Sequence, residues 1–197
     1  MPKNKTRGNV KKELKARLRK IKLFMIDVDG VLAKSSIIWA GSLSGDGLHE
    51  IKEFCVHDGA ASWAAKEAGL LRVLVSGRDS AVVRQRAERM KVDGIYLNNL
   101  NKLEILEALK KEHHLLDAEI AYIGDDFLDL PILKKVGFPV AVQDAVPEVK
   151  KAARYITRKK GGEGAVAETI RLILNSQGKW KKGYEKAIEK AYNSSSH

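Results

Sequence analysis

Six short apolar runs, each closing on or beside a polar or small residue, recur along the 197-residue chain. Runs of this length are typical of buried strands, whereas the stretches between and after them carry apolar residues at helical spacing. Strands that alternate with helices favour an α/β fold with a doubly wound, mainly parallel sheet covered on both faces. The runs lie at 22–26, 71–76, 94–97, 119–124, 139–142 and 155–157, and the helical patterns at 60–68, 81–90, 103–109 and 165–174.

One segment, residues 33–57, interrupts this alternation. Two apolar stretches, 37–39 and 51–56, flank a piece rich in Gly and Ser, and Asp46-Gly47 is a common turn signal between paired strands. About 25 residues are too few for a domain with its own core. We therefore predict a β-hairpin flap, inserted after the first strand and projecting from the sheet.

The net charge of +11 is concentrated at the two ends of the chain. Residues 1–22 hold ten Lys or Arg and one Glu (+9), residues 178–197 hold five Lys and two Glu (+3), and the middle carries −1. A basic arm can bind phosphate backbones or anionic membranes, but this one has no aromatic residue, so a solvated end is the preferred interpretation. We divide the chain into a basic N-terminal arm (1–21), a folded domain (22–176) and a C-terminal helix or tail (177–197).

Composition excludes several classes of protein. With 44% hydrophobic and 31% charged residues, the chain has material for a core and is neither intrinsically disordered nor a membrane protein. No apolar stretch approaches the roughly 18 residues of a spanning helix, and residues 1–22 lack the apolar centre of a secretory signal. The single cysteine, Cys55, can form neither an internal disulfide nor a zinc cluster. We expect a cytoplasmic protein.

The candidates for chemistry are the polar residues at the strand ends, because ligands of a doubly wound sheet bind beyond the carboxyl ends of its strands. Asp27 and Asp29 stand two apart and point the same way on an extended chain. Two crowded carboxylates favour a hard divalent cation, most simply Mg²⁺. One can be a nucleophile toward phosphorus and the other a general acid and base. A turn capped by Asp, with Gly30 at positive φ, is the structural alternative.

Two further strand ends offer groups that bind anions. Ser76 and Gly77 stand where a strand turns into a helix, so a hydroxyl, an amide and a helix N-terminus could together hold a phosphoryl group. Capping by Ser80 is the alternative there, and it leaves Ser76 unexplained. Asn101 is a predicted helix cap that puts Lys102 at the first helical position, against the helix dipole. A cation there suggests an anionic partner, with an ordinary surface lysine as the alternative.

The last strand end carries three carboxylates within five residues, in the sequence Gly124-Asp125-Asp126-Phe127-Leu128-Asp129. One or two acidic residues at a helix start are ordinary, because the helix dipole favours them. Three exceed what capping needs. We interpret them as the second half of a Mg²⁺ cage whose first half is the Asp27 pair.

The order of these motifs is more specific than any one of them, since each follows its own strand. In this order the chain resembles the haloacid dehalogenase superfamily of phosphohydrolases, with their Rossmann-like fold, over about residues 22–175. Within it, the chain is similar to the minimally capped 3-deoxy-D-manno-octulosonate 8-phosphate phosphatases and the related nonulosonate 9-phosphate phosphatases. The motifs that carry this closer resemblance lie at 58–59, 75–78, 124–131, 144–147 and 161–166.

The resemblance implies a Mg²⁺-dependent phosphoric monoester hydrolase that works through an aspartyl-phosphate. Asp27 would be the nucleophile and a metal ligand. Asp29 would be the general acid and base and bind the metal through its backbone carbonyl, and Asp125 would be the remaining ligand, with its neighbours Asp126 and Asp129 ordering its surroundings. The residues implied to hold the phosphoryl oxygens are Ser76, Gly77 and Lys102.

The resemblance also implies a small phosphorylated sugar acid as substrate, a role in lipopolysaccharide biosynthesis, and a homotetramer. In that family the flaps of four subunits form a central barrel, and a neighbour completes each active site. Apolar residues on an exposed hairpin would be a liability in a monomer, which agrees with a tetramer. Those residues are Ile37, Ile38, Trp39 and Leu43.

Two positions depart from the family pattern and bear on the substrate. His57 stands where family members often carry Arg before Asp-Gly, and Ala167 stands where an Arg often precedes Glu168. The family's arginines are candidate partners of a sugar carboxylate, so the chain leaves the octulosonate itself in question. Arg78 and Lys66 are the candidates to replace them.

Two other functions compete with a phosphatase. A non-catalytic or regulatory domain, of the kind attached to some acylneuraminate cytidylyltransferases, would keep the fold without turnover. Nucleic-acid binding through residues 1–22 ranks last, and we expect neither a nucleic-acid nor a membrane partner. The intact set of implied catalytic and phosphate-binding residues favours the enzyme over both.

Overall fold

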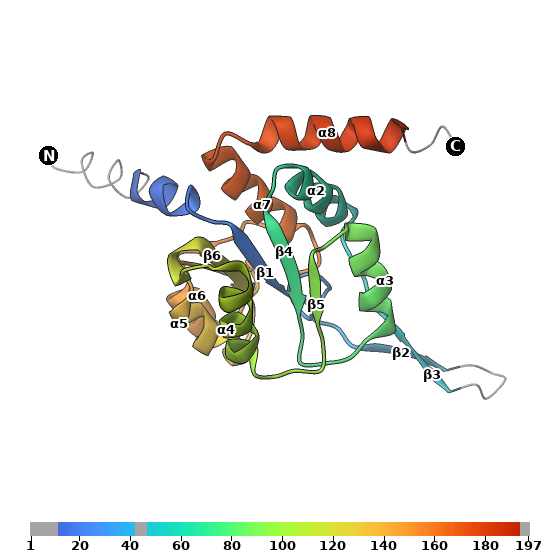
Figure 1. Ribbon diagram of the computed structural model, residues 1–197. Coiled ribbons are helices and arrows are strands. Elements are labelled where there is room, and N and C mark those ends of the chain that lie inside the picture. Colours follow the sequence, from blue (N-terminus) through green and yellow to red (C-terminus); the bar gives the residue numbers. More distant parts are fainter. Residues whose placement is uncertain (1–11, 42–46, 194–197) are drawn as a thin grey trace, which may run out of the picture.

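The computed structural model describes residues 12–41 and 47–193, and its centre is a six-stranded parallel sheet (Figure 1). The strand order is β5-β4-β1-β6-β7-β8, and each neighbouring pair is parallel. This confirms the predicted fold class. The strands are β1 (Leu23–Asp27), β4 (Leu71–Val75), β5 (Gly94–Tyr96), β6 (Ile120–Gly124), β7 (Phe138–Ala141) and β8 (Tyr155–Ile156).

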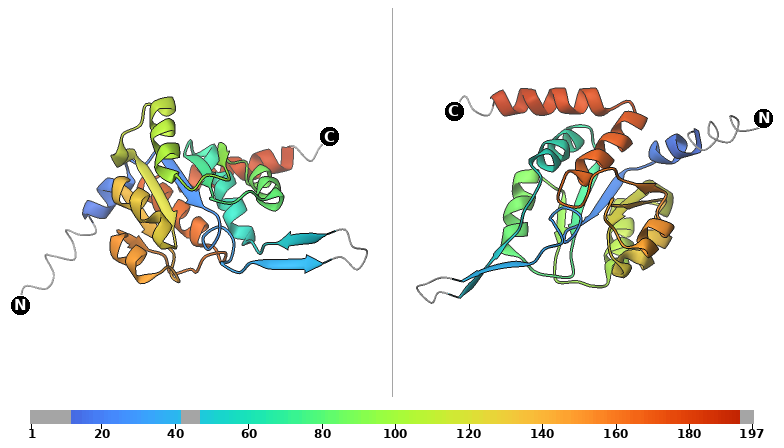
Figure 2. Two further views of the ribbon diagram at one scale, coloured as in Figure 1. Left: turned by 90° about the horizontal axis from the view of Figure 1, so that it is seen from below. Right: turned by 180° about the vertical axis from the view of Figure 1, so that it is seen from behind.

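Helices cover both faces of the sheet (Figures 1 and 2). One face carries α2 (Val56–Glu67), α3 (Ala81–Met90) and α7 (Ala165–Ser176), and the other carries α4 (Lys102–His113), α5 (Leu130–Lys135) and α6 (Pro147–Ala152). Two 3-10 turns, η1 (Asp117–Glu119) and η2 (Phe127–Asp129), lie before and after β6. The predicted C-terminal segment forms α8 (Trp180–Asn193), which packs on α2.

The two innermost strands are buried along their whole length, because helices lie on both of their faces. Every residue of β1 and of β6 is buried. The chain winds from β1 outward through β4 to β5, then crosses back to β6 and winds outward the other way. The carboxyl ends of β1 and β6 therefore flank the point where the winding reverses, which is the usual ligand crevice of such sheets.

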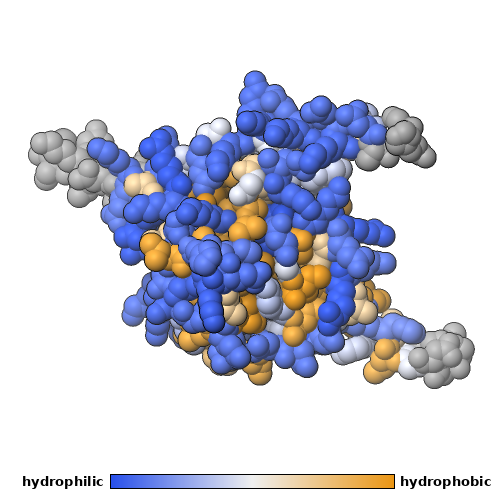
Figure 3. Space-filling model, in the orientation of Figure 1, coloured by the Kyte–Doolittle hydropathy of each residue, from blue (hydrophilic) through white to orange (hydrophobic). Residues whose placement is uncertain are grey.

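The predicted flap is an antiparallel hairpin of β2 (Ile38–Gly41) and β3 (Leu48–Ile51), which projects from the body of the molecule (Figure 2). Its apolar side chains stay exposed. Trp39 is 52% and Leu48 68% exposed, and Figure 3 shows apolar surface on the hairpin. Leu43 and the predicted turn residue Asp46 lie outside the described residues. Among the described residues, the main packing of the hairpin is between its own two strands.

In the described part of the basic arm the lysine side chains are exposed to solvent, but its backbone is folded and two apolar side chains enter the core. Residues 12–18 are helical, and Leu18 and Ile21 are buried in the core. The side-chain amide of Gln177 donates hydrogen bonds to the carbonyls of both residues (3.2 and 2.7 Å). A fold that began at residue 22 would lose both core residues. Among the described residues, no helix is long and apolar enough to cross a membrane.

Candidate active site

Asp27 is the last residue of β1, and the turn that follows brings it against the end of β6. Asp27 is 7% exposed. Gly30 has φ +81, and a Cβ there would lie 1.9 Å from Asp125 Oδ2. A side chain at position 30 would therefore displace the Asp125 carboxyl group from its place beside the end of β1.

Lys102, at the start of α4, links the end of β1 to the segment after β6 through its ammonium group. As predicted, it is the first residue of α4, capped by Asn101, whose side chain accepts from the Glu104 N–H. Its ammonium group donates to Asp27 Oδ1 (2.9 Å), Asp129 Oδ1 (2.6 Å) and the Tyr122 hydroxyl (2.9 Å). The cation at the helix start thus has anionic partners, and they belong to two other elements.

Three carboxylates form a compact acidic cluster at this edge. Asp27, Asp125 and Asp129 each offer an oxygen within 4.8 Å of the others. Burial and the Asp129 charge, only partly offset by Lys102, raise the pKa of Asp27 to about 7. Burial and the charges of Asp27, Asp129 and Asp126 raise the pKa of Asp125 to about 8. Such repulsion is relieved by a bound cation, and carboxylate oxygens are the ligands that Mg²⁺ prefers, so the residues fit this ion.

The acidic cluster opens into a cavity of about 250 Å³ that also holds the predicted phosphate-binding residues. Ser76 follows β4, and its hydroxyl donates to Asp29 Oδ2 (3.3 Å) and accepts from the Arg78 N–H (3.1 Å). Gly77 lies on the wall, where a Cβ would come within 2.3 Å of Leu100. Of the predicted site residues, Asp27, Asp29, Ser76, Gly77, Arg78, Lys102 and Asp125 all line this one cavity.

Lys66 is the one predicted substrate residue that the structure does not bring to the cavity. It lies in the last turn of α2, just before β4 begins, so it is at the amino edge of the sheet. Helices of this fold run antiparallel to the strands, and the end of α2 is therefore remote from the carboxyl edge that holds Asp27. Arg78, by contrast, donates to Glu50 Oε1 (3.3 Å) beside the cavity.

Sequence reasoning missed three residues that contact the predicted site. Tyr122 belongs to β6, and its hydroxyl donates to Asp129 Oδ1. Lys52 and Glu50 come from the base of the flap, where Lys52 contacts Asp29 and lies 3.2 Å from Glu50. The sequence holds a signal for each of them. Tyr122 is a tyrosine in an otherwise aliphatic buried strand, and Glu50 and Lys52 are an acid and a base two residues apart, on one strand face.

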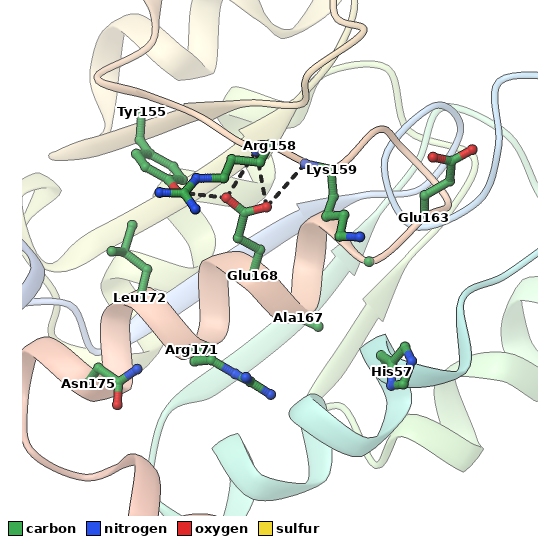
Figure 4. A pocket seen from close by; sticks show the side chains of 11 residues that line it. His57, Tyr155, Arg158, Lys159, Glu163, Ala167, Glu168, Arg171, Leu172 and Asn175 are labelled. Carbon is green, nitrogen blue, oxygen red and sulfur yellow. Dashed lines mark hydrogen bonds between the residues drawn. The ribbon is translucent and has the colours of Figure 1, made fainter.

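A second, larger cavity of about 620 Å³ runs along α7 (Figure 4). The two positions that depart from the family pattern, His57 and Ala167, both line it. Its cationic side chains include Arg158, Lys159 and Arg171, which the sequence did not single out. It shares no lining residue with the acidic cavity, within the part of the chain that the structure describes.

The carboxylate of Glu168, on the wall of this second cavity, accepts hydrogen bonds from groups of the protein itself. Glu168 accepts from the Tyr155 hydroxyl (2.7 Å) and from the backbone N–H groups of Arg158 and Lys159 (Figure 4). Glu168 therefore holds the end of β8 to α7.

Known proteins resemble this chain in sequence and in fold. A family model of haloacid dehalogenase-like hydrolases matches residues 80–170. The 3-deoxy-D-manno-octulosonate 8-phosphate phosphatase KdsC of Escherichia coli K12 is 36% identical over 172 residues, which is 87% of this chain and 89% of that protein.

Two solved structures show the same relationship. One is the 3-deoxy-D-manno-octulosonate 8-phosphate phosphatase of Moraxella catarrhalis, in complex with magnesium, phosphate and KDO (TM-score 0.81, 34% identity, 88% of this chain and 97% of that one). The other is the cobalt-bound deoxy-D-mannose-octulosonate 8-phosphate phosphatase of Haemophilus influenzae (TM-score 0.76, 33% identity, 86% and 99%). The chain therefore belongs to the haloacid dehalogenase-like hydrolases, in the family of the 3-deoxy-D-manno-octulosonate 8-phosphate phosphatases.

Proposed function

We propose that this phosphoric monoester hydrolase removes phosphate from a small phosphorylated sugar acid, either 3-deoxy-D-manno-octulosonate 8-phosphate or a nonulosonate 9-phosphate. The observation that carries the proposal is the meeting of Asp27, Lys102 and Asp125 at the reversal point of the sheet. A nucleophile, a fixed cation and a second carboxylate around one small cavity suit phosphoryl transfer, which needs mainly positioning and charge stabilisation.

Asp27 is the proposed nucleophile. One of its oxygens forms a bond to phosphorus as the bond to the sugar oxygen breaks, and Asp29 gives its proton to that leaving oxygen. In the second step a water oxygen attacks the phosphorus, its proton passes to Asp29, and the Asp27–phosphorus bond breaks. The phosphoryl oxygens are held by Ser76, the Gly77 amide and Lys102, which line the same cavity.

The proposed cofactor is Mg²⁺, held by the carboxylates of Asp27 and Asp125 and the backbone carbonyl of Asp29. When bound, the ion would neutralise charge on the phosphoryl oxygens during transfer. Asp129 takes no ligand role in this scheme, because its two oxygens accept from Lys102, Tyr122 and the Asp125 N–H. Asp129 instead orients Lys102 and the backbone of Asp125.

We further propose a cytoplasmic homotetramer assembled through the flap. The exposed apolar residues of β2 and β3 support this, since a two-stranded hairpin is only marginally stable in water. The folded unit would comprise the phosphatase domain with the described part of the N-terminal arm and α8.

Phosphate release from a substrate panel tests the function. The panel holds octulosonate 8-phosphate, nonulosonate 9-phosphates, common sugar phosphates and nucleoside monophosphates, each with Mg²⁺ and with EDTA. We expect Mg²⁺-dependent turnover of a sugar acid phosphate and loss of at least about 10³-fold in kcat in Asp27→Asn. Activity confined to nucleotides would contradict the substrate class, and no turnover of any ester would favour a regulatory domain.

A further inference from the structure

The base of the flap reaches into the acidic cavity of its own chain. Lys52 follows β3 directly, and its side chain is 4% exposed. Its ammonium group contacts Asp29 Oδ1 and lies 3.2 Å from Glu50 Oε1. A buried lysine is stable only when paired, and here both partners are carboxylates.

The contact leaves the two oxygens of Asp29 in different surroundings. Oδ1 is held by Lys52, whereas Oδ2 accepts only a longer hydrogen bond from the Ser76 hydroxyl (3.3 Å). The Ser76 side is also the side of the proposed phosphoryl pocket. Proton transfer therefore suits Oδ2, provided that Oδ1 stays anchored.

Lys52 is itself fixed by a wider network. Glu50 forms an ion pair with Lys52 (3.2 Å) and accepts hydrogen bonds from Arg78 (3.3 Å) and from the Ser80 hydroxyl, so the base of β3 is tied to the loop after β4. The side chain of Glu50 is 12% exposed. Lys52 is thus held between Asp29 and Glu50, and Glu50 is in turn held by the loop after β4.

From this geometry we infer that Lys52 is a positioning residue, which holds Oδ1 of Asp29 so that Oδ2 faces the leaving oxygen. The inference rests on the proposed phosphatase function and deepens it. It gives the flap a role within its own subunit, separate from assembly. Lys52 touches neither the phosphorus nor the leaving group in this scheme, and it acts only through Asp29.

The test compares two aryl esters that differ by one nitro group, phenyl phosphate and p-nitrophenyl phosphate. The p-nitrophenolate group leaves without protonation, whereas phenolate depends more on a general acid. The measured quantity is kcat/KM, which covers only the steps up to formation of the aspartyl-phosphate. In Lys52→Met we expect kcat/KM to fall about 100-fold for phenyl phosphate and less than about fivefold for p-nitrophenyl phosphate.

Matched variants separate positioning from folding. Lys52→Arg keeps the charge and should recover about tenfold of the loss on phenyl phosphate. Lys34→Met removes the other lysine at the flap base, which pairs with Glu53 (2.7 Å) and not with Asp29, and should change both esters by less than about twofold. Should Lys52→Met fail to fold by circular dichroism, Lys52→Gln provides the same comparison.

Equal losses on the two esters, or no loss on either, would overturn the role of Lys52 while leaving the proposed function intact. A wild-type enzyme inactive in Mg²⁺ on both esters and on every sugar acid phosphate of the panel would instead overturn the proposed function itself. The two failures are therefore distinguishable in one set of assays.

Discussion

The unfavourable interaction of Lys102 with the dipole of its own helix is offset by carboxylates of other elements. At the first position of α4 its charge opposes the helix dipole by some tenths of a kcal/mol. Burial lowers its pKa, but the charges of Asp27 and Asp129 outweigh burial and raise that pKa above the ordinary value. The lysine therefore stays charged at neutral pH, as the fixed cation that the proposed phosphoryl site needs.

Asp125 should reveal the metal site through stability as well as activity. Its pKa of about 8 means that ionisation penalises the folded state, so in EDTA at pH 8.5 we expect Asp125→Asn to be more stable than wild type by about 1–3 kcal/mol. Saturating Mg²⁺ should raise the melting temperature of wild type and not that of the variant. Thermal melts with Mg²⁺ and with EDTA measure both effects.

Asp126→Asn is the matched control for that experiment. Asp126 is adjacent in sequence but outside the acidic cluster, and its side chain caps η2 through the Phe127 N–H. The control variant should keep the Mg²⁺ response. An Asp125→Asn protein that responds to Mg²⁺ as wild type does would contradict its assignment as a ligand.

Asp58, which lies outside the acidic cluster, should make stability depend on pH. Burial raises its pKa to about 6, although the Ala167 N–H (2.7 Å) and the Arg86 charge oppose this, and its Oδ2 has no hydrogen-bond partner. The folded pKa lies above the unfolded one, so the contribution of Asp58 is fully present below about pH 4 and lost as pH rises through 6.

Replacing Asp58 by Asn removes this loss. We expect the free energy of unfolding of Asp58→Asn, relative to wild type, to rise by about 2–3 kcal/mol between pH 4 and pH 7. Urea denaturation at several pH values gives this difference. A difference that does not change with pH would show that Asp58 ionises in the fold as easily as in the unfolded chain.

At the scale of elements, the strands were predictable and the short helices were not. Each predicted strand of the six-stranded sheet ends within one residue of its observed end, because a polar or small residue follows each apolar run. The flap is different, since its second apolar stretch was expected at 51–56, whereas β3 spans Leu48–Ile51. The helices α5 and α6 have six residues each, which is too short for a 3.6-residue period to show. The start of α2 was placed at Ala60 rather than Val56, because its N-cap, Cys55, makes no side-chain cap.

The residues of the candidate site also fall into two groups, those that could be predicted from the sequence and those that could not. Residues that end strands, such as Asp27 and Ser76, could be assigned from the sequence because the sheet brings strand ends together. Lys52 and Tyr122 could not, because their contacts depend on how the flap folds back and which way a buried strand faces. Their partners lie 23 and 20 residues away, at Asp29 and Lys102.

The loop before α7 closes on the loop after β1 without space for a side chain. A Cβ at Gly161 would lie 1.8 Å from the carbonyl oxygen of Gly30, a backbone atom that no rotamer change can move. We expect Gly161→Ala to lower the free energy of unfolding by about 2–4 kcal/mol and to reduce turnover, since Gly30 adjoins Asp29. Urea denaturation and phosphate release measure the two effects.

Gly69→Ala is the control for this backbone contact. Gly69 has φ +77 but nothing within 4 Å of an added Cβ, so only the conformational strain of about 1 kcal/mol remains, with activity unchanged. Equal stability losses in the two variants would contradict a steric role for Gly161.

For the whole molecule, the proposed tetramer depends on the exposed apolar side chains of the flap. Ile38 and Ile51 face each other across the hairpin, 46% and 47% exposed, and Trp39 is exposed beside them. Wild type should behave in light scattering as four chains of 21.8 kDa, whereas Trp39→Lys should shift toward monomer. A wild-type protein of monomer mass would contradict the tetramer.

The hydrogen bonds from Gln177 to the carbonyls of Leu18 and Ile21 have a practical meaning for handling the enzyme. They hold residues 12–21 and the start of the C-terminal segment together near the start of β1, whereas Asp27 and the acidic cavity lie at the other end of this strand. Proteolytic cleavage after residue 21, used to remove a purification tag, would also remove two core side chains, those of Leu18 and Ile21. Immobilisation on a resin through the helix at residues 12–18, by contrast, would leave the acidic cavity open to the solution.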